Sequence, residues 1–426
     1  MTMTEMNLDV IKQAVRGTAA AFRRVVELHP AGGPGTKVFP PTYEGGKYAT
    51  EKRRINGETV ECVLLDSVQS QANRMELALQ EAVDEGLISL PVITVDFRNT
   101  GASFIGRITS LEAPHRIADA ILRDSEWDDG TGRKVTFRRT PVGEALNTAS
   151  LQNATALFEH CPTALVFGMW DSTGERGGLG VKFPRAIVSE IIGIGALAGQ
   201  RTAGRLDPLQ ISLKAGPIYE TEDGDWTLDP DKAKRKNGKP ILYGKGGKPS
   251  EINHGNVTPS LVVQKDKNGN PVDRTGTPTK RADEWIPIGG FTIDRAQQIT
   301  VISLPTLRRL RFPVNGNSNA DLSGQVVLTT LALCAATLSS QKGYNLRSQC
   351  DLHPVDALRW EILGLNETFT LSAETAIQLF NQAVDEAKQS GLPWNSGGMT
   401  LTPCADLVEM VLRSRVSSAE EQEEES

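Results

Sequence analysis

The stretch PTALVFGMWDSTGERGGLGVKFPRAIVSEIIGIGALAG, from Pro162 to Gly199, is the segment on which the interpretation of the chain depends. Its first part, Ala164–Trp170, is a short apolar run bounded by turn residues, and such a run predicts a buried strand. Its last part follows Pro184 and is apolar on nearly every side, which predicts a buried helix. A loop rich in glycine and basic residues separates the two.

This loop has the composition of a phosphate-binding segment. Glycine exposes backbone N–H groups and lets a polyanion approach closely, while Arg176, Lys182 and Arg185 supply positive charge. It does not fit the nucleotide-binding templates: GxxxxGK(S/T) cannot be placed on it, and Phe183 stands where GxGxxG needs its third glycine. Two interpretations stay open, a phosphate-binding loop and a flexible surface turn with solvated charges.

Composition limits the class of protein. The chain has 426 residues, enough for one large domain or two, and a formal net charge of −6. Five glutamates lie among the last seven residues, so the rest of the chain is close to neutral. A surface that binds a polyanion would therefore require local clustering of basic residues.

The sequence favours a reducing, cytoplasmic location. The five cysteines are scattered and contain no CxxC pair, which is atypical of a disulfide framework. The N-terminus lacks the features of an export signal. The longest apolar run, Val326–Leu338, is shorter than the roughly 20 residues of a membrane span, so we expect a buried helix and no membrane contact.

A glycine- and proline-rich segment, His29–Gly57, follows a predicted strand at Phe22–Leu28. It mixes cations with aromatic residues, and this combination suits single-stranded nucleic acid because backbone charge and base stacking are both available. An ordinary solvated loop is the alternative. The candidate contacts are Lys37, Tyr43, Arg53 and Arg54.

A predicted strand at Val60–Leu65 leads into a helix whose apolar face includes Ala72, Met75 and Leu79. Polar residues crowd its first turns, where free N–H groups and the helix dipole favour anions. Capping and solvation of the helix start would explain them equally well. The candidate phosphate contacts are Gln69, Gln71, Asn73 and Arg74.

The remaining elements predict an α+β fold. The alternation of strands and helices allows a βαββαβ sheet with helices on one face, decorated by insertions. Further strands are predicted at Leu90–Arg98, Leu209–Leu213 and Ile299–Leu304, and further helices at Ala113–Leu122, Leu322–Gln341, Ser372–Lys388 and Ala405–Arg413.

The composition changes between Ala215 and Pro287, where an acidic run is followed by a lysine-rich run and periodicity is poor. Such a segment predicts a protruding insertion. Its basic half suits contact with nucleic acid or a neighbouring subunit, and a solvated arm with self-compensating charge is the alternative.

The sequence contains none of the common catalytic motifs. GxSxG, HExxH, paired zinc motifs and DxD are absent, and the five histidines lie far apart. We therefore expect a binding protein rather than an enzyme, with no catalytic residue, metal or cofactor.

Four segments, in matching order, resemble the backbone subunit of type I-G (formerly I-U) CRISPR effector complexes, a member of the RAMP superfamily. The likeness extends over roughly residues 18–415. The segments are LLDSVQSQANRMELAL (Leu64–Leu79), SLEAPHRIADAILRDS (Ser110–Ser125), FGMWDSTGERGGLGVKFPRAIVSEIIG (Phe167–Gly193) and TIDRAQQITVISLPTLRRLRFP (Thr292–Pro313).

This resemblance implies an RRM/ferredoxin-like core, or palm, formed by residues 1–214 and 286–416 with additional packed C-terminal helices. It further implies a thumb-like arm at 215–285, with His29–Gly57 as the alternative thumb, and we expect a disordered acidic tail at 417–426. Copies of such a subunit assemble into a filament along one crRNA, and target recognition is left to base pairing.

The resemblance also implies the partners and the site. The partners are crRNA, target DNA through the guide, neighbouring copies and other Cascade subunits. A ribonuclease of the RAMP type and an enzyme with a phosphate-bearing cofactor are the alternatives. The implied RNA-binding residues are Arg176, Gly177, Gly178, Lys182 and Arg185, then Gln69, Gln71, Asn73 and Arg74, and also Arg53, Arg54, Lys37 and Tyr43.

Overall fold

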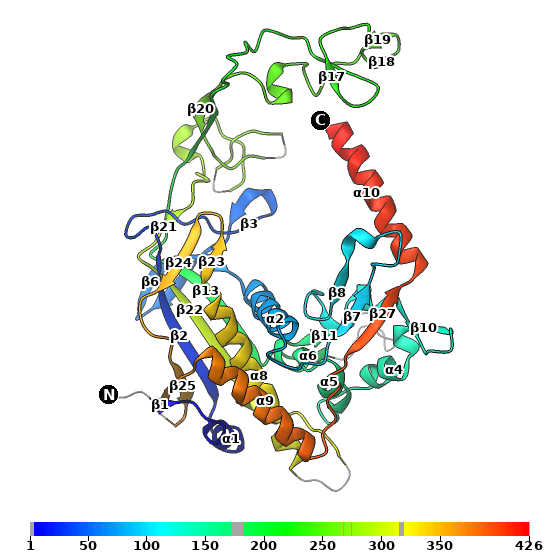
Figure 1. Ribbon diagram of the computed structural model, residues 1–426. Helices are drawn as coiled ribbons and strands as arrows, with labels where there is room; N and C mark the ends of the chain where they lie inside the picture. Colours follow the sequence, from blue (N-terminus) through cyan, green and yellow to red (C-terminus); the bar gives the residue numbers. More distant parts are fainter. Residues whose placement is uncertain are drawn as a thin grey trace. The chain divides into compact units, whose positions relative to one another are not determined.

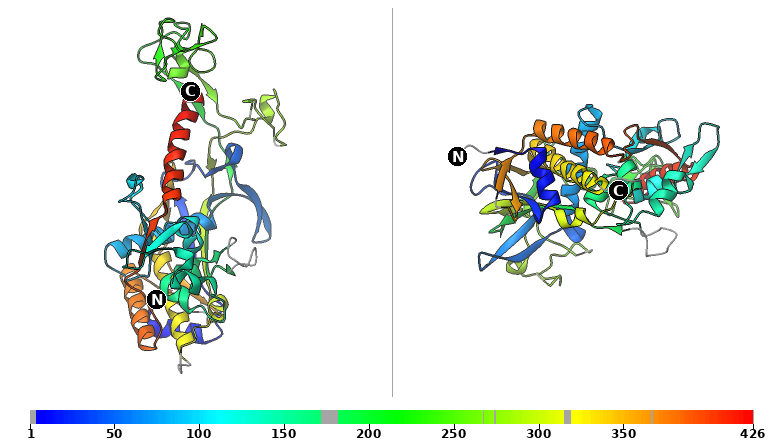
Figure 2. Two further views of the ribbon diagram at one scale, coloured as in Figure 1. Left: turned by 90° about the vertical axis from the view of Figure 1, so that its right-hand side faces the viewer. Right: turned by 90° about the horizontal axis from the view of Figure 1, so that it is seen from below.

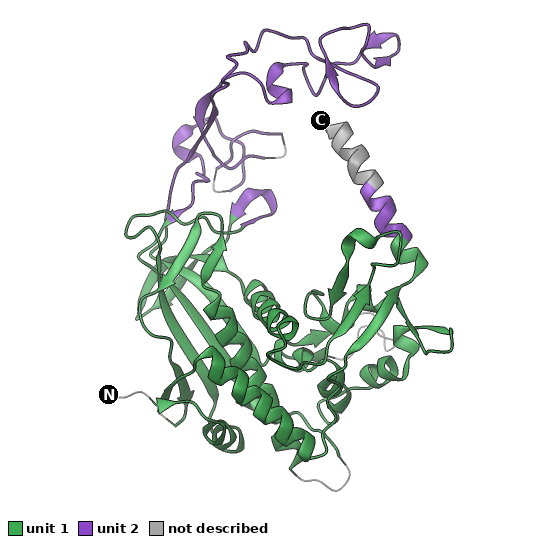
Figure 3. Ribbon diagram, viewed as in Figure 1, with its two compact units in different colours: residues 1–41, 48–197, 292–408 green, residues 42–47, 198–291, 409–426 purple. Residues whose placement is uncertain are grey.

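The computed structural model describes residues 4–171, 182–266, 268–273, 275–314, 319–365 and 367–425, with side chains as far as residue 415. The chain forms two compact units, coloured separately in Figure 3. Unit 1 comprises Met1–Pro41, Tyr48–Leu197 and Thr292–Val408, and unit 2 comprises Thr42–Lys47, Ala198–Phe291 and Glu409–Ser426.

The chain is an α+β protein, as the sequence predicts (Figure 1). The helices α2, α8 and α9 lie where the apolar periodicity of the sequence places them. The described α-helices are α1 (Leu8–Arg16), α2 (Val68–Asp84), α3 (Ala120–Arg123), α4 (Pro141–Asn147), α5 (Thr155–His160), α6 (Thr163–Phe167), α7 (Leu304–Arg308), α8 (Ala320–Gln341), α9 (Ala373–Gln389) and α10 (Ala405–Glu425).

A ten-stranded sheet organises unit 1, with the strand order β1–β26–β25–β2–β22–β13–β6–β5 and with β24 and β23 attached beside β2. Its strands are β1 (Thr4–Glu5), β2 (Ala21–Pro30), β5 (Thr50–Ile55), β6 (Glu58–Asp66), β13 (Ile187–Ile194), β22 (Arg295–Ser303), β23 (Tyr344–Arg347), β24 (Cys350–Pro354), β25 (Trp360–Leu363) and β26 (Glu367–Thr370).

The central elements of this sheet follow one another along the chain as β2, α2, β13, β22, α8 and β25. This is a β-α-β-β-α-β succession. In the sheet the four strands lie in the order β25–β2–β22–β13, and each neighbouring pair is antiparallel. The β5–β6 hairpin is inserted between β2 and α2, and the large segment 198–291 is inserted between β13 and β22.

Helix α8 is the core helix of unit 1. Because nearly every side chain from Ala320 to Leu338 is buried, the helix needs apolar residues all round. It packs against α1, α2, α9 and β22, and Figure 1 shows α8 and α9 side by side. By length and composition α8 would be able to span a membrane. However, 83% of its 18-residue apolar stretch is buried inside the protein, as predicted for a core helix.

A second, five-stranded sheet also belongs to unit 1, with the order β10–β9–β27–β7–β8. The strand predicted at Leu90–Arg98 is present as β7, but it pairs with β27 and β8 here and not with the large sheet. The strands are β7 (Ile93–Asp96), β8 (Arg107–Thr109), β9 (Ser125–Asp128), β10 (Lys134–Thr136) and β27 (Met399–Pro403).

The prediction for the Pro162–Gly199 stretch is wrong in both elements. Its first apolar run forms the short helix α6 and then β11 (Met169–Trp170), which pairs with β12 (Lys182–Phe183). The run after Pro184 forms β13, a central strand between β22 and β6. The second half of β13, Ile191–Ile194, is buried at every position, so it lacks the period of two that separates strand from helix, and only the β-branched residues favour a strand.

Two further predicted elements are absent. The helix expected at Ala113–Leu122 is broken into a 3-10 turn (Arg116–Ala118) and α3, because Arg116 has φ +54° and Asp119 caps α3 by accepting from the Ile121 N–H. No strand forms at Leu209–Leu213. Instead Asp207 accepts the backbone N–H groups of that loop.

The segment His29–Gly57 contains more regular secondary structure than the loop that the sequence predicts. Its second half is β5, which pairs with β6 across Asn56 and Gly57. These two residues have φ +51° and +88°, the values of a type I′ hairpin turn, for which Asn-Gly is the preferred sequence. The Asn-Gly pair is therefore a sequence signal for this hairpin.

The inserted part of unit 2, residues 198–291, consists mainly of short two-stranded ribbons joined by long loops (green to yellow-green in Figures 1 and 2). This part is wider than the predicted arm at 215–285. Helix α10 continues to Glu425 and includes most of the acidic segment predicted as disordered. The ribbons pair β15 (Thr202–Arg205) with β20 (Val257–Leu261), β16 (Tyr219–Glu220) with β17 (Trp226–Thr227), and β18 (Arg235–Lys236) with β19 (Lys239–Pro240).

Candidate functional site

Helix α2 carries four of the predicted contact residues, and its burial pattern separates them. The Ser67 side chain caps the helix by accepting from the Ser70 N–H. Gln69 and Asn73 lie one turn apart and are both exposed. They form an accessible polar stripe at the start of the helix, and their contact with phosphate stays a prediction.

Gln71 and Arg74 point into the protein instead, where they bind the buried carboxylate of Asp66. The Gln71 Nε2 and Arg74 Nε atoms donate to Asp66 Oδ2 at 2.6 and 2.9 Å. Gln71 Oε1 accepts from Ser189 Oγ at 3.0 Å and from Gln298 Nε2 at 2.7 Å. Gln71 is only 3% exposed, so its burial contradicts the predicted phosphate contact, and its side chain fastens α2 to β13 and β22.

The opposite side of α2 contributes Glu76 to a buried polar centre that the sequence does not predict. Arg116 Nε and Nη2 donate to the two Glu76 carboxylate oxygens at 2.6 and 2.7 Å. Arg116 Nη1 donates to the Gly168 carbonyl at 3.0 Å, and the guanidinium lies over the Phe167 ring. This bidentate pair joins α2, the 3-10 turn at Arg116 and the end of α6.

Arg185 is the third member of this centre. Its Nη1 atom is buried and has no hydrogen-bond partner. Burial lowers the Arg185 pKa, and the charge of Arg116 lowers it further, whereas Glu76 opposes both effects. Burial raises the Glu76 pKa to about 6, although Arg116 pulls in the other direction. Both guanidinium groups thus interact electrostatically with Glu76, and Arg116 is hydrogen-bonded to it. We call Glu76, Arg116 and Arg185 the arginine centre.

The rest of the predicted loop is only partly described. Lys182 is exposed in β12, with its ammonium nitrogen 5.6 Å from the centre of the Trp170 ring. That geometry is a cation–π contact and leaves the charge at the surface. Arg176, Gly177 and Gly178 lie outside the described residues.

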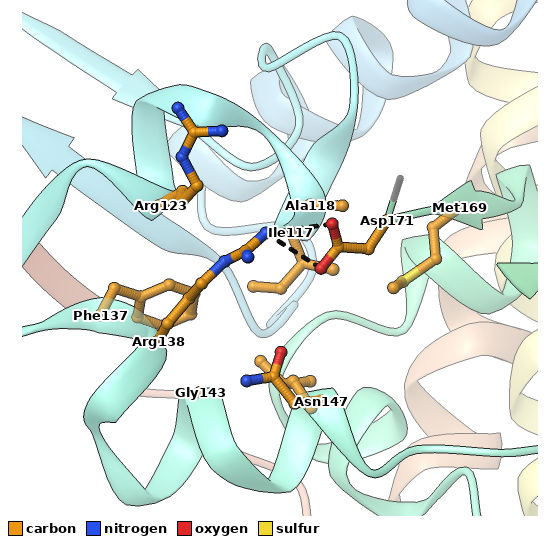
Figure 4. Close-up of a pocket in the computed structure, with 10 residues that line it drawn as sticks. Ile117, Ala118, Arg123, Phe137, Arg138, Gly143, Asn147, Met169 and Asp171 are labelled. Atoms are coloured by element: carbon orange, nitrogen blue, oxygen red, sulfur yellow. Dashed lines mark hydrogen bonds and ion pairs between the residues drawn. The ribbon is translucent and has the colours of Figure 1, made fainter. Parts of the chain in front are cut away.

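A small pocket is lined by residues that are near the arginine centre in the sequence, with Ile117, Phe137 and Met169 among its apolar lining (Figure 4). Its two arginines are paired with carboxylates. Arg138 Nη2 donates to both Asp171 oxygens at 3.0 Å, and Arg123 binds Asp124. This pocket carries compensated charge, and is less suited to an anion than the arginine centre.

The four candidates from the His29–Gly57 segment differ in their surroundings. Arg53 pairs with Glu51 and Glu190 on the sheet, and hydrogen bonds to these carboxylates raise its pKa. Arg54 is exposed, and Lys37 is partly exposed. Tyr43 belongs to unit 2 and is 45% exposed. Their contacts with RNA stay predictions.

One signal for the arginine centre is present in the sequence. Glu76 falls on the apolar stripe of α2, between Ala72 and Leu79 at helical spacing. A carboxylate on a buried face requires a buried partner. The partner cannot be found from sequence, since Arg116 lies 40 residues away in a segment whose pattern predicts a regular helix.

The fold and the site together define an α+β protein with a partly uncompensated arginine centre beside its central sheet. Residues 23–197, less than half of the chain, match the model of a family described as CRISPR-associated protein GSU0053. The matched region includes all three members of the arginine centre. The match supports a CRISPR-associated protein and points to a role in CRISPR defence. A comparison with curated proteins found no match.

Proposed function

We propose that this protein is the crRNA-binding backbone subunit of a type I CRISPR effector complex, of the I-G subtype. The observation that carries the proposal is the match of residues 23–197 to a CRISPR-associated family. The backbone role and the subtype come from the resemblance of the four sequence segments described above.

The topology of unit 1 supports an RRM/ferredoxin-like palm. Its strand order β25–β2–β22–β13 is the order 4-1-3-2 of a βαββαβ unit, with α2 and α8 as the two helices. The long insertion between β13 and β22, residues 198–291, supports a thumb-like arm, because it replaces what would be a simple hairpin turn.

The distribution of charge supports contact with an RNA backbone. In unit 1 the candidate cations are Lys182, Arg185 and Arg54. Unit 2 presents a run of exposed lysines on a protein that is acidic overall, and such local clustering is what a polyanion requires. These lysines are Lys232, Lys236, Lys239, Lys245 and Lys248.

In this proposal the protein acts in the cytoplasm as a structural subunit without catalysis of its own. Its partners are crRNA, target DNA through the guide, neighbouring copies in a filament and the other subunits of the complex. It holds the sugar–phosphate backbone, and base pairing supplies the sequence specificity.

The first test is purification of the full chain from an expressing cell, with the ratio of absorbance at the nucleic-acid and protein maxima recorded and the particles imaged before and after RNase treatment. We expect RNA-containing oligomers that dissociate with RNase. A monomer that carries no nucleic acid and does not bind added single-stranded RNA would contradict the proposed function.

A further inference from the structure

The arginine centre is held by an unusual backbone and by a glycine. Arg116 has φ +54°, a conformation that costs free energy in a non-glycine residue. That conformation accompanies its three hydrogen bonds to Glu76 and Gly168. Gly168 has φ +81°, and a Cβ atom there would lie 2.9 Å from Arg185 Cγ. The local backbone is therefore matched to the placement of both arginines.

The charges of the centre do not balance. The side chains of Arg116 and Glu76 are 7% and 3% exposed, so their ion pair is shielded from water. Both Glu76 oxygens accept a hydrogen bond from Arg116. Arg185 repels Arg116, and its buried Nη1 has no partner. A buried cationic group of this kind is costly unless an anion or an acceptor completes it.

Solvent reaches part of the Arg185 side chain, which lies in the segment between β12 and β13, whereas its Nη1 atom and the side chains of Arg116 and Glu76 are buried. An anion from solvent can therefore approach the exposed part of this side chain. Arg138 and Arg123, by contrast, already have carboxylate partners. Of the described arginines Arg116, Arg123, Arg138 and Arg185, only Arg185 lacks a hydrogen-bonded carboxylate.

We propose that Arg116 is a positioning residue that keeps the Glu76 carboxylate occupied and so leaves Arg185 ready to bind a phosphate group of the RNA backbone, while the negative charge of Glu76 limits the affinity. This inference rests on the proposed function and deepens it, because it assigns two residues that touch no RNA to the RNA-binding machinery. Arg116 fixes the place of Arg185 by occupying the Glu76 carboxylate, and Glu76 sets the net charge of the centre.

Phosphate binding at Arg185 should depend on pH. The groups that interact electrostatically with Glu76 are Arg116 from the 3-10 turn, Arg185 from the segment before β13, and Cys161 after α5. A phosphate on Arg185 would repel the Glu76 carboxylate and favour its protonated form. Phosphate binding is then linked to proton uptake, so RNA affinity rises as the pH falls through about 6, the pKa of Glu76.

The experiment measures binding of a fluorescent oligouridine to the full chain, freed of bound RNA, by anisotropy at pH values below and above the Glu76 pKa of about 6. Oligouridine has no base that titrates in this range. The readout is the difference between wild type and Glu76→Gln, which isolates the contribution of this one carboxylate. The matched control is Glu361→Gln, which removes a carboxylate from the exposed Arg23–Glu361 pair.

We expect Glu76→Gln to bind about three- to ten-fold more tightly than wild type on the alkaline side of the Glu76 pKa, and equally on the acid side. Glu361→Gln keeps the wild-type profile. A merely structural role of Glu76 would instead weaken binding at every pH. The inference is overturned if RNA affinity changes with pH equally in Glu76→Gln and wild type. It is also overturned if the wild-type affinity does not rise toward acid pH.

Arg185→Ala decides the question if Glu76→Gln does not fold, which thermal unfolding reveals. Its partly exposed side chain can be removed with less damage to the core. We expect weaker binding and a smaller rise of affinity toward acid pH than in wild type. An unchanged rise in Arg185→Ala contradicts the inference. Binding by wild type without this pH dependence leaves the proposed function standing, whereas absence of RNA binding at every pH overturns both.

Discussion

At the scale of single residues, Gly168 shows how a backbone position can determine the placement of charged side chains. Its carbonyl accepts from Arg116, and its missing Cβ leaves room for the stem of Arg185. Its φ of +81° is accessible to glycine at little cost. One residue thus satisfies three requirements of the arginine centre.

Gly168→Ala should therefore lower the free energy of unfolding by about 2–4 kcal/mol, from the positive φ and the clash with Arg185 together. Urea unfolding measures this. Gly132→Ala is the matched control, since Gly132 has φ +85° but nothing within 4 Å of an added Cβ. The control should lose only about 1 kcal/mol. Equal losses in the two variants would show that the clash is relieved without cost.

At the scale of secondary-structure elements, polar side chains determine how α2 sits on the large sheet. Asp66 is fully buried at the end of β6, and Gln71 connects it to Ser189 on β13 and Gln298 on β22. Buried polar groups arranged in this way are costly when one partner is removed. The network therefore fixes the register of the helix against three strands.

Gln71→Ala should destabilise the protein by about 2–4 kcal/mol, because Asp66, Ser189 and Gln298 each lose a hydrogen bond in the core. Gln69→Ala, two residues away and exposed, should change the free energy of unfolding by less than about 0.5 kcal/mol. Chemical denaturation of both variants tests the assignment. A Gln71→Ala protein as stable as wild type would mean that the network contributes no net stability.

The elements also show what can be predicted from sequence. The apolar faces of α2, α8 and α9 predict these helices, and runs of alternating or β-branched residues predict β2, β6 and β22. The sequence of β13 suggests a helix because every residue from Ile191 to Ile194 is buried, which removes the alternation from that half of the strand. The hairpin at Asn56 and Gly57 is absent from the prediction although its turn sequence is visible.

At the scale of the whole molecule, the two units differ in how they would contact RNA. Unit 1 contains the arginine centre on a sheet with a large core, whereas unit 2 consists of short ribbons with exposed lysines. Contacts of exposed lysines with phosphate are mainly electrostatic, so they should appear in the salt dependence of binding.

Replacing the exposed lysines of unit 2, from Lys232 to Lys248, with glutamine should weaken the binding of single-stranded RNA, whatever the RNA sequence. The slope of log affinity against log salt should become shallower by up to about 0.7 for each phosphate that a lysine no longer neutralises. Neutralising the exposed acidic residues Glu222, Asp223 and Asp225 serves as the control, and should leave affinity unchanged or higher. An unaltered salt slope in the lysine variant would exclude unit 2 from the interface.

From the sequence the fold class, the core helices α2, α8 and α9, and the strands β2, β6 and β22 could be predicted. These depend on local periodicity and local composition, which each short segment carries within itself. The tertiary structure was needed to separate the exposed Gln69 and Asn73 from the inward-pointing Gln71 and Arg74, to place β7 in a second sheet, and to bring Arg116 and Arg185 near Glu76. Burial and charge pairing arise between segments far apart in the chain, so no single segment contains the information that specifies them.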